Sequence, residues 1–378
     1  DPSKRSVSFD ELMAAYKEQM AALKEARADL FLLETTFDGL NAKAAIYAYL
    51  DLFENESERI PIAVSMTVSD ASGRILSGQT IEAFYNSIEH CNPLFVGLNC
   101  SLGADKMRPY IETFNRIAKC YTHCYPNAGL PNPLSESGYD QTPEMTATYV
   151  AEYAKEGLLN VIGGCCGTTP EHIAKIIEYT KDCAPRTPQK GDFSLKVSGL
   201  QQLVIPENNA PFVLVGERNN VMGSGIFRKA IKEGRYHDAV AISRKQIENG
   251  ANVIDINFDE AMLDAVECMR HFLRLLESEP EISKVPFMID SSNWAALKEG
   301  LKNVQGKPIV NSLSLKEGEE TFLKKAKEVK KYGAALVVMA FDENGQAATK
   351  EDKVRICRRA YRLLVDKIGF NPCDIIFD

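Results

Sequence analysis

Three cysteines of this 378-residue chain lie where apolar, strand-like runs end. Cys100 follows the run 93–98, and Cys165 and Cys166 follow the run 158–162 within a glycine-rich stretch. Zinc prefers a tetrahedral shell, and a catalytic zinc often takes three protein ligands and leaves the fourth position open. These residue types therefore suggest a zinc site whose open position receives the thiol of a substrate.

The chemistry of such a site favours holding a thiol over activating water. Three thiolates on Zn²⁺ leave a formal charge of about −1. The metal lowers a thiol pKa from about 8.5, so a nucleophilic thiolate exists at neutral pH. Gly163, Gly164 and Gly167 would let the backbone bend until two adjacent cysteines reach one ion. Buried structural cysteines are the alternative, because a lone Cys-Cys pair is a weak signal; the glycine framing at a strand end favours metal ligands.

Alternating helices and strands must position these cysteines. The sequence predicts helices over 9–27, 41–53, 80–90, 105–118, 143–156 and 170–181, and strands over 30–33, 62–68, 93–98, 119–124 and 158–162. Strict alternation with nearly continuous apolar strands predicts a parallel sheet covered by helices. About five such units are present, whereas a (β/α)₈ barrel needs eight. An open doubly wound sheet is the alternative to an incomplete barrel.

Residues 185–210 interrupt this alternation with prolines and glycines among polar residues, which is typical of an interdomain linker. A second α/β series follows, with strands over 212–215, 252–256, 286–289, 308–310, 335–340 and 374–377 and helices over 236–249, 262–276, 294–301, 319–332 and 350–368. We therefore expect an α/β fold of two TIM-type (β/α)₈ barrels in tandem, both incomplete in this sequence. The expected domains are 1–184 and 211–378.

Polar residues recur at the ends of the strands in the second series. They are Glu217-Arg218-Asn219, Asp255, Asn257, Asp290-Ser291-Ser292, Asn311-Ser312, Asp342-Glu343 and Asp378. The carboxyl ends of parallel barrel strands point into the mouth of the barrel, where catalytic loops gather. One Asp after a strand is usually a helix cap or a loop residue. Recurrence after six strands favours a polar ligand site.

Composition excludes several other classes of function. The net charge of −8 and the absence of long runs of like charge speak against nucleic acid as a partner. No apolar run approaches the roughly 20 residues of a membrane span. The ten cysteines are scattered through a long chain, which predicts reduced thiols and a cytoplasmic location.

Short motifs in both halves point to one family. They are Phe31-Leu-Leu-Glu-Thr35, Gly97-Leu-Asn-Cys100, Tyr125-Pro-Asn-Ala-Gly-Leu-Pro131, Gly163-Gly-Cys-Cys-Gly167, Gly216-Glu-Arg-Asn219, Ile289-Asp-Ser-Ser-Asn293, Ile309-Val-Asn-Ser312 and Val338-Met-Ala-Phe-Asp342. With them the chain resembles the cobalamin-dependent methionine synthases, as an internal fragment spanning the homocysteine barrel and the methyltetrahydrofolate barrel. The first set is shared with betaine–homocysteine methyltransferase, and the second with pterin methyltransferases and dihydropteroate synthases. Both sets in this order are more specific than either alone.

The resemblance implies roles for particular residues. Cys100, Cys165 and Cys166 would be the ligands of Zn²⁺, and Glu34 would bind the amino group of homocysteine. In the second half, the residues implied to bind the folate are Asp290, Asn311, Asp378 and the loop residues Asn219, Gly223, Ser224 and Gly225.

The resemblance also implies a reaction. The methyl group of 5-methyltetrahydrofolate would pass to cobalamin, and methylcobalamin would methylate zinc-bound homocysteine. Asp290 and Asn311 are candidates for the hydrogen-bond network that favours a proton on N5 of the pterin. No histidine here has an aspartate two residues before it, so we expect cobalamin to be bound by a different domain of a longer chain. The alternatives are a betaine-type zinc-dependent homocysteine S-methyltransferase and a non-catalytic protein that binds zinc and folate.

Overall fold

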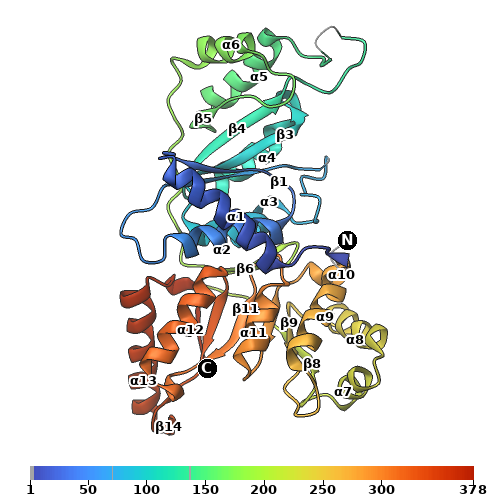
Figure 1. Cartoon of the computed structure of the whole chain (residues 1–378), viewed down its shortest axis with the longest axis vertical. Coiled ribbons are helices and arrows are strands. Elements are labelled where there is room, and N and C mark those ends of the chain that lie inside the picture. Colours follow the sequence, from blue (N-terminus) through green and yellow to red (C-terminus); the bar gives the residue numbers. More distant parts are fainter. Residues whose placement is uncertain (1–3, 70, 136–137) are drawn as a thin grey trace.

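The computed structural model describes residues 4–69, 71–135 and 138–378 and contains two parallel sheets, each covered by helices (Figure 1). One sheet lies in each half of the sequence, and the two halves stack along the longest axis of the molecule. The α/β class expected from the sequence is confirmed. Within the described residues, the edge strands of each sheet do not pair with each other.

The first sheet has five parallel strands in sequential order, and α/β units of the expected kind build it. Its strands are β1 (Phe31–Thr36), β2 (Ile62–Met66), β3 (Phe95–Gly103), β4 (Tyr121–Asn127) and β5 (Val161–Ile162). The helices are α1 (Phe9–Glu25), α2 (Gly39–Leu52), α3 (Ile81–Ile88), the 3₁₀ turn η2 (Glu89–Cys91), α4 (Ala104–Ile117), α5 (Pro143–Lys155) and α6 (Pro170–Thr180). Because all strands run the same way, their carboxyl ends gather at one edge of the sheet.

Side chains alternate across this first sheet. Phe31 and Leu33 of β1 pack into the core beneath the helices, while Leu32 and Glu34 are exposed on the other face. Helix α1 begins at a capping box formed by Ser8 and Glu11. The expected helices and strands of this half agree with the observed ones to within three residues, with one exception. The strand expected over 93–98 continues to Gly103 as β3, so Cys100 lies inside the strand and does not follow it.

The second sheet has six parallel strands, again in sequential order. They are β8 (Val215–Asn220), β9 (Val253–Asn257), β10 (Phe287–Asp290), β11 (Ile309–Leu313), β12 (Ala335–Val338) and β15 (Ile375–Phe377). The helices are α7 (Gly225–Lys232), α8 (Tyr236–Glu248), α9 (Ala265–Glu277), α10 (Pro280–Ser283), α11 (Trp294–Leu301), α12 (Glu319–Lys331) and α13 (Lys350–Arg362). Shorter elements are η3 (Leu315–Glu317), the π-helix η4 (Leu363–Lys367), η5 (Pro372–Asp374) and the hairpin of β13 (Phe341–Asp342) and β14 (Gly345–Gln346).

Three expectations for the ends of these strands are wrong. Asn311 and Ser312 lie inside β11, which continues to Leu313 beyond the strand expected over 308–310. Glu217 and Asn219 lie inside β8, which starts at Val215, three residues later than the strand expected over 212–215. Asp342 lies in the β13–β14 hairpin and pairs with Arg355 of α13, so it does not end the preceding strand, which stops at Val338. Apolar runs locate a strand but do not mark its ends, because flanking loop residues are apolar here too.

The segment expected to be a linker, 185–210, contains an antiparallel hairpin of β6 (Leu195–Ser198) and β7 (Gln202–Ile205). Val197 of the hairpin packs with buried residues of the second sheet, including Met288. Ser198 Oγ accepts a hydrogen bond from Lys307 N–H and donates one to Ala83 O in α3. The hairpin therefore contacts both halves of the chain.

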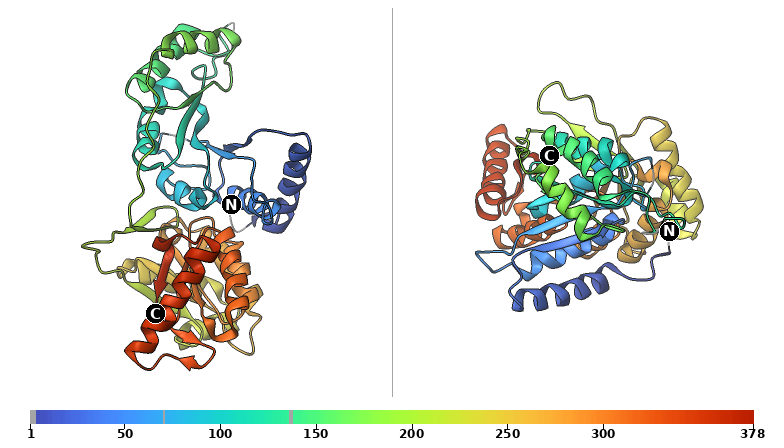
Figure 2. Two further views of the ribbon diagram at one scale, coloured as in Figure 1. Left: turned by 90° about the vertical axis from the view of Figure 1, so that its left-hand side faces the viewer. Right: turned by 90° about the horizontal axis from the view of Figure 1, so that it is seen from above.

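The two halves also share an interface at α2 (Figure 2). The buried Lys43 ammonium of α2 donates to Val304 O at 2.8 Å and to Gly306 O at 2.9 Å. Tyr47 packs against Tyr332 with ring centroids 4.7 Å apart. These buried contacts make the junction part of the hydrophobic core of the second half.

Candidate functional site

The three cysteines expected to bind zinc lie together at the carboxyl end of the first sheet. Sγ of Cys166 is 3.6 Å from Sγ of Cys100 and 3.9 Å from Sγ of Cys165, and all three sulfurs lie within 4.8 Å of one another. A tetrahedral zinc with Zn–S bonds of about 2.3 Å places its sulfurs about 3.8 Å apart. Cys166 is exposed and the other two are half-buried. The cluster fits one zinc ion and leaves it accessible to a fourth ligand.

Asn99, the residue before Cys100, organises the cluster from a fully buried position. Its Oδ1 accepts hydrogen bonds from the Ser65 hydroxyl at 2.6 Å and from Thr35 N–H at 3.1 Å. Its Nδ2 donates to Thr35 Oγ1 at 2.9 Å and to Cys165 Sγ at 3.8 Å. One buried amide thus ties three strands to a candidate metal ligand.

The backbone around Asn99 is bent into a conformation that L residues rarely adopt. Thr35, Cys100 and Ser101 have φ angles of 56°, 61° and 64°. A left-handed conformation is unfavourable for these residue types, above all for β-branched Thr35, and it persists only where the surroundings enforce it. The bend coincides with a register shift between β3 and β4 after Asn99, so Cys100 leaves the regular ladder.

The turn that carries Cys165 and Cys166 is anchored to the end of β4. Cys165 N–H donates to Pro126 O at 2.8 Å, and Cys166 N–H donates to the side-chain oxygen of Asn127 at 3.1 Å. Gly167 has φ +78° and supplies the turn that follows. Sequence reasoning missed the roles of Asn99 and Asn127, although each is an amide at a strand end within a quoted motif.

The thiol of Cys165 lies where it resists ionisation. Burial raises the pKa of Cys165 to about 11, and the hydrogen bond from Asn99 opposes that rise. Tyr139 lies beside the cluster, and burial together with the charge of Cys166 raises the pKa of its hydroxyl. Thiolates form readily at such a place only with a cation beside them, which is the chemistry of a metal site.

Glu34 lies at the same edge of the sheet as the thiols. It is exposed, and it precedes Thr35, which is hydrogen-bonded to Asn99. Its negative charge raises the pKa of the Tyr125 hydroxyl on β4, which lies three strands along the sheet from β1. The structure therefore brings the three cysteines together and places Glu34 at the same edge of the sheet.

A second cluster, of carboxyl and amide groups, lies at the carboxyl end of the second sheet. Asp290 stands in register with Asn257 on one side and with Asn311 on the other. Asp290 Oδ2 accepts a hydrogen bond from Asn257 Nδ2 at 2.9 Å. Asp255 and Glu217 act electrostatically within the same group. Of the residues expected to bind folate, Asp290 and Asn311 thus lie side by side.

The two buried carboxyls of this acidic cluster hold protons unusually well. Burial raises the pKa of Asp255 to about 7, and the charges of Asp290 and Glu217 add to the shift. Burial also raises the pKa of Asp290 to about 6, against the hydrogen bond from Asn257. Among the described residues, Oδ1 of Asp255 has no hydrogen-bond partner. Asp255 was expected only as a strand-end residue; a charged residue inside the apolar run 252–256 was the available signal.

Asn219 does not join this acidic cluster. Its side chain is fully buried and accepts hydrogen bonds from Ser243 at 3.1 Å and from Gln246 at 2.6 Å, both on α8. Alternation along β8 turns it toward the helices rather than toward the open face of the sheet. The expected contact between Asn219 and folate therefore needs a different arrangement of this strand.

The remaining expected folate residues are accessible. Gly223 and Gly225 are exposed, and Ser224 caps α7 by accepting a hydrogen bond from Phe227 N–H at 3.3 Å. Asp378 is also exposed, and its backbone pairs with β12 and the residues after it. Their positions at the end of β8 and β15 place them at the same edge of the sheet as Asp290.

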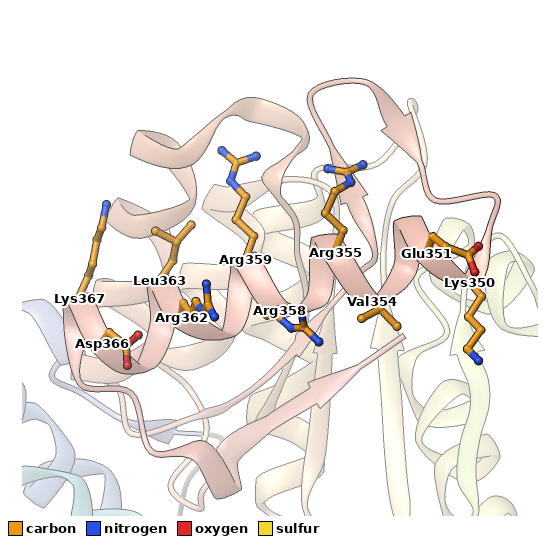
Figure 3. A pocket seen from close by; sticks show the side chains of 10 residues that line it. All are labelled: Lys350, Glu351, Val354, Arg355, Arg358, Arg359, Arg362, Leu363, Asp366 and Lys367. Atoms are coloured by element: carbon orange, nitrogen blue, oxygen red, sulfur yellow. The ribbon is translucent and has the colours of Figure 1, made fainter.

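A surface pocket on the outside of α13 is unrelated to either cluster (Figure 3). Arg355 and Arg359, which line it, form ion pairs with Asp342 and Glu343. Its lining residues are Lys350, Glu351, Val354, Arg355, Arg358, Arg359, Arg362, Leu363, Asp366 and Lys367. None of the residues expected to bind a substrate belongs to this set.

Comparisons with known proteins assign a family to each half. Residues 1–180 match the homocysteine S-methyltransferase family, and residues 216–378 match the pterin binding enzyme family. The resemblance to the homocysteine and folate modules of methionine synthase is therefore confirmed at the level of these two domains.

Two solved structures are similar to parts of this chain. The homocysteine methyltransferase MmuM from Escherichia coli is 22% identical, with a TM-score of 0.32 over 46% of this chain and 57% of that one. The HPPK-DHPS protein of Plasmodium falciparum is 21% identical, with a TM-score of 0.35 over 48% of this chain and 32% of that one. The chain thus spans less than two thirds of the length of either.

Within the described part of the chain, no helix combines the length and the apolar character needed to cross a membrane.

Proposed function

We propose that this chain carries the two substrate sites of a cobalamin-dependent methionine synthase, which moves a methyl group from 5-methyltetrahydrofolate to homocysteine. The matches to a homocysteine S-methyltransferase family and a pterin binding family support methyl transfer between homocysteine and a folate. The observation that carries the finer proposal is the three-thiol cluster, whose sulfur spacing suits zinc and whose outer face is accessible.

In the first domain, proposed to span 1–184, Cys100, Cys165 and Cys166 would hold zinc. The ion would supply a lowered pKa for the substrate thiol, so that homocysteine reacts as a thiolate at neutral pH. Asn99 donates a hydrogen bond to the sulfur of Cys165, and Asn127 accepts one from the backbone N–H of Cys166. Glu34, exposed at the same edge, would bind the ammonium group of the amino acid.

In the second domain, proposed to span 211–378 and to be joined through 185–210, the acidic cluster would bind the pterin. Asp290, Asn311 and Asp378 offer acceptors for the 2-amino and ring N–H groups, and Asn311 can also donate. A carboxyl with a pKa of about 6, as in Asp290, exchanges its proton near neutral pH. Asp290 and Asn311 would therefore help to keep a proton on N5, which makes tetrahydrofolate a better leaving group.

Cobalamin is proposed as the methyl carrier on the strength of the sequence resemblance, and no described residue is assigned to it. A betaine-type S-methyltransferase would use the thiol cluster but leaves the acidic cluster of the second sheet without a role. A non-catalytic protein that binds zinc and folate is the other alternative.

Metal analysis combined with ligand titration tests the proposal. The purified chain should contain about one zinc per molecule, and Cys166→Ala should lose it, because three thiolates supply most of the binding energy. Cys183→Ala, a half-buried cysteine outside the cluster, is the matched control. L-homocysteine should bind only the zinc-loaded protein, and 5-methyltetrahydrofolate should bind the wild type but not Asn311→Ala.

Turnover separates the alternatives. Homocysteine methylation with methylcobalamin as donor, but not with betaine, supports the methionine synthase assignment. Methylation with betaine would establish the first alternative, and ligand binding with no transfer from either donor would establish the second. Unchanged zinc in Cys166→Ala would refute the metal site itself.

A further inference from the structure

Tyr125 is the first residue of the quoted motif 125–131, and the proposed function gives it no role. It stands in β4 directly opposite Asn99 of β3, the residue that donates a hydrogen bond to Cys165. On its other side, β5 leads into the turn that carries Cys165 and Cys166. Tyr125 therefore lies between the strand that carries Asn99 and Cys100 and the strand that leads to Cys165 and Cys166.

Packing on two sides holds the Tyr125 ring in place. Its centroid lies 4.3 Å from that of the His123 ring, which is itself fully buried and packs against Phe95 at 5.2 Å. A methyl group added at Gly163 would lie 2.7 Å from Cδ1 of Tyr125, closer than carbon atoms approach in folded proteins. Glycine at 163 therefore gives the ring its space, and the ring in turn contacts the strand that positions the thiols.

Tyr125 is only half-buried, so part of its ring is accessible on the open face of the sheet. Burial raises the pKa of the Tyr125 hydroxyl, and the negative charge of Glu34 raises it further. The side chain is thus a neutral aromatic surface at the edge of the sheet that carries both Glu34 and the three thiols. An amino acid that reaches both groups would lie across this edge, beside the ring.

We propose that Tyr125 is a specificity-determining residue that selects the length of the amino-acid thiol. Its ring is the wall against which the two methylene groups of homocysteine lie while the amino group reaches Glu34 and the sulfur reaches the cysteine cluster. The inference rests on the proposed function, because it takes Glu34 and the three thiols as the two ends of the substrate site. It adds the residue that selects a substrate by the length of chain between its amino group and its sulfur.

Binding measurements on the zinc-loaded chain test this role without requiring turnover. The probes are L-homocysteine and its homologue with one more methylene group, 2-amino-5-mercaptopentanoate, titrated by calorimetry. One methylene is worth on the order of 10-fold or more in a packed site, so the wild type should favour homocysteine by about that factor. Tyr125→Ala should lower the ratio of the two affinities to below about 3-fold. Tyr125→Phe should keep the wild-type ratio, because the ring and not the hydroxyl forms the wall.

Tyr121→Ala is the matched control. Tyr121 lies on the same strand and, by alternation, on the same face as Tyr125, but near the start of the strand and away from the thiols. Zinc content is measured for every variant, so that a lost metal site is not mistaken for lost selectivity. Tyr125→Leu, which keeps apolar bulk without a ring, serves if Tyr125→Ala does not fold, and the same reduced ratio is expected.

A double variant gives an independent test. Gly163→Ala should push the ring toward the substrate and weaken homocysteine binding by about 10-fold or more. Tyr125→Ala in the same chain should restore part of that loss, because the displaced ring is gone. Loss that Tyr125→Ala does not restore would overturn the role of the ring.

The failures are distinguishable. A wild type that binds zinc but no homocysteine refutes the proposed function and this inference with it. A wild type that binds homocysteine selectively, with an unchanged ratio in zinc-loaded Tyr125→Ala, refutes this inference alone. A ratio that collapses in Tyr125→Phe would likewise overturn it, since selectivity would then reside in the hydroxyl.

Discussion

The two candidate sites lie at the carboxyl ends of two parallel sheets, yet their ionisable groups differ. The first site has thiols and the second has carboxyls. In the first, the sulfur of the exposed Cys166 lies 3.6 Å from that of Cys100 and 3.9 Å from that of Cys165. The neutral amides of Asn99 and Asn127 form hydrogen bonds with the Cys165 sulfur and with the backbone N–H of Cys166. In the second, the groups acting on Asp255 and Asp290 are carboxylates and amides, and both carboxyls hold their protons to near neutral pH.

The difference follows from what each site would bind. Neighbouring thiols become thiolates when a cation is present, so a metal ion can complete the first site. Buried carboxyls beside amides match a flat neutral ring that presents N–H donors. The carboxyl end of a parallel sheet can therefore bind either a metal ion or a flat polar ring. The side chains at the strand ends decide which of the two it binds. Four sets of substitutions test this contrast.

The largest effect is expected from Asn99→Ala. It removes the donor to Cys165 and leaves Ser65 and Thr35 without their partner, so zinc affinity should fall by about 10- to 100-fold. Competition with a chromophoric chelator measures this affinity. Affinity for 5-methyltetrahydrofolate should not change, because Asn99 lies in the other half of the chain. Zinc affinity equal to that of the wild type would show that the thiols hold their places unaided.

The second change, Asp255→Asn, should stabilise the fold at high pH. The pKa of Asp255 is raised from 3.8 to about 7 on folding, so the folded chain binds an extra proton, and stability falls as the pH rises through this range. Removing the carboxyl should make the gain in free energy of unfolding about 2 to 3 kcal/mol larger at pH 8 than at pH 5. Urea denaturation at both pH values measures it.

Asp182→Asn, at an exposed turn, is the control for the pH experiment and should show no such difference. An equal gain for Asp255→Asn at pH 5 and pH 8 would mean that the carboxyl is not titrating in this range.

The third change concerns ligand binding by Asp290. Its pKa is raised to about 6, and an ionised carboxylate accepts hydrogen bonds from pterin N–H groups better than a protonated one. Affinity for 5-methyltetrahydrofolate should therefore rise by about 3- to 10-fold between pH 5 and pH 7. Asp290→Asn should bind more weakly at pH 7 and show a flat profile, followed by fluorescence titration. A profile with the same slope in both proteins would assign the titration to another group.

The smallest effect is expected at the pocket on α13. Arg358→Ala combined with Arg362→Ala should change the affinities for zinc and for 5-methyltetrahydrofolate by less than about 2-fold, as surface substitutions usually do. The pocket contains none of the residues proposed to bind either ligand. A larger loss of folate affinity would extend the acidic site toward this helix.

The sequence allowed most of the first half to be predicted. Strand and helix periods are local properties, and Ser8, Thr80 and Thr142 cap helices in the structure at their side-chain oxygens. In the second half, prediction failed where the pattern was ambiguous. Glu217 and Asn219 lie within β8 rather than after it, and the hairpin β6–β7 occupies a segment that has few periodic apolar residues.

The sequence by itself determined the chemistry available at each site: three thiols at strand ends in one half, and aspartates and asparagines at strand ends in the other. Only the tertiary structure decided which of these groups meet. Parallel pairing brings Cys100 to Cys166 across 66 residues and sets Asp290 between Asn257 and Asn311. It also turns Asn219 toward α8 and buries Asp255 beside other carboxyls. The physical reason is that a residue's type is local, whereas its burial, register and neighbouring charges arise from segments far apart in the chain.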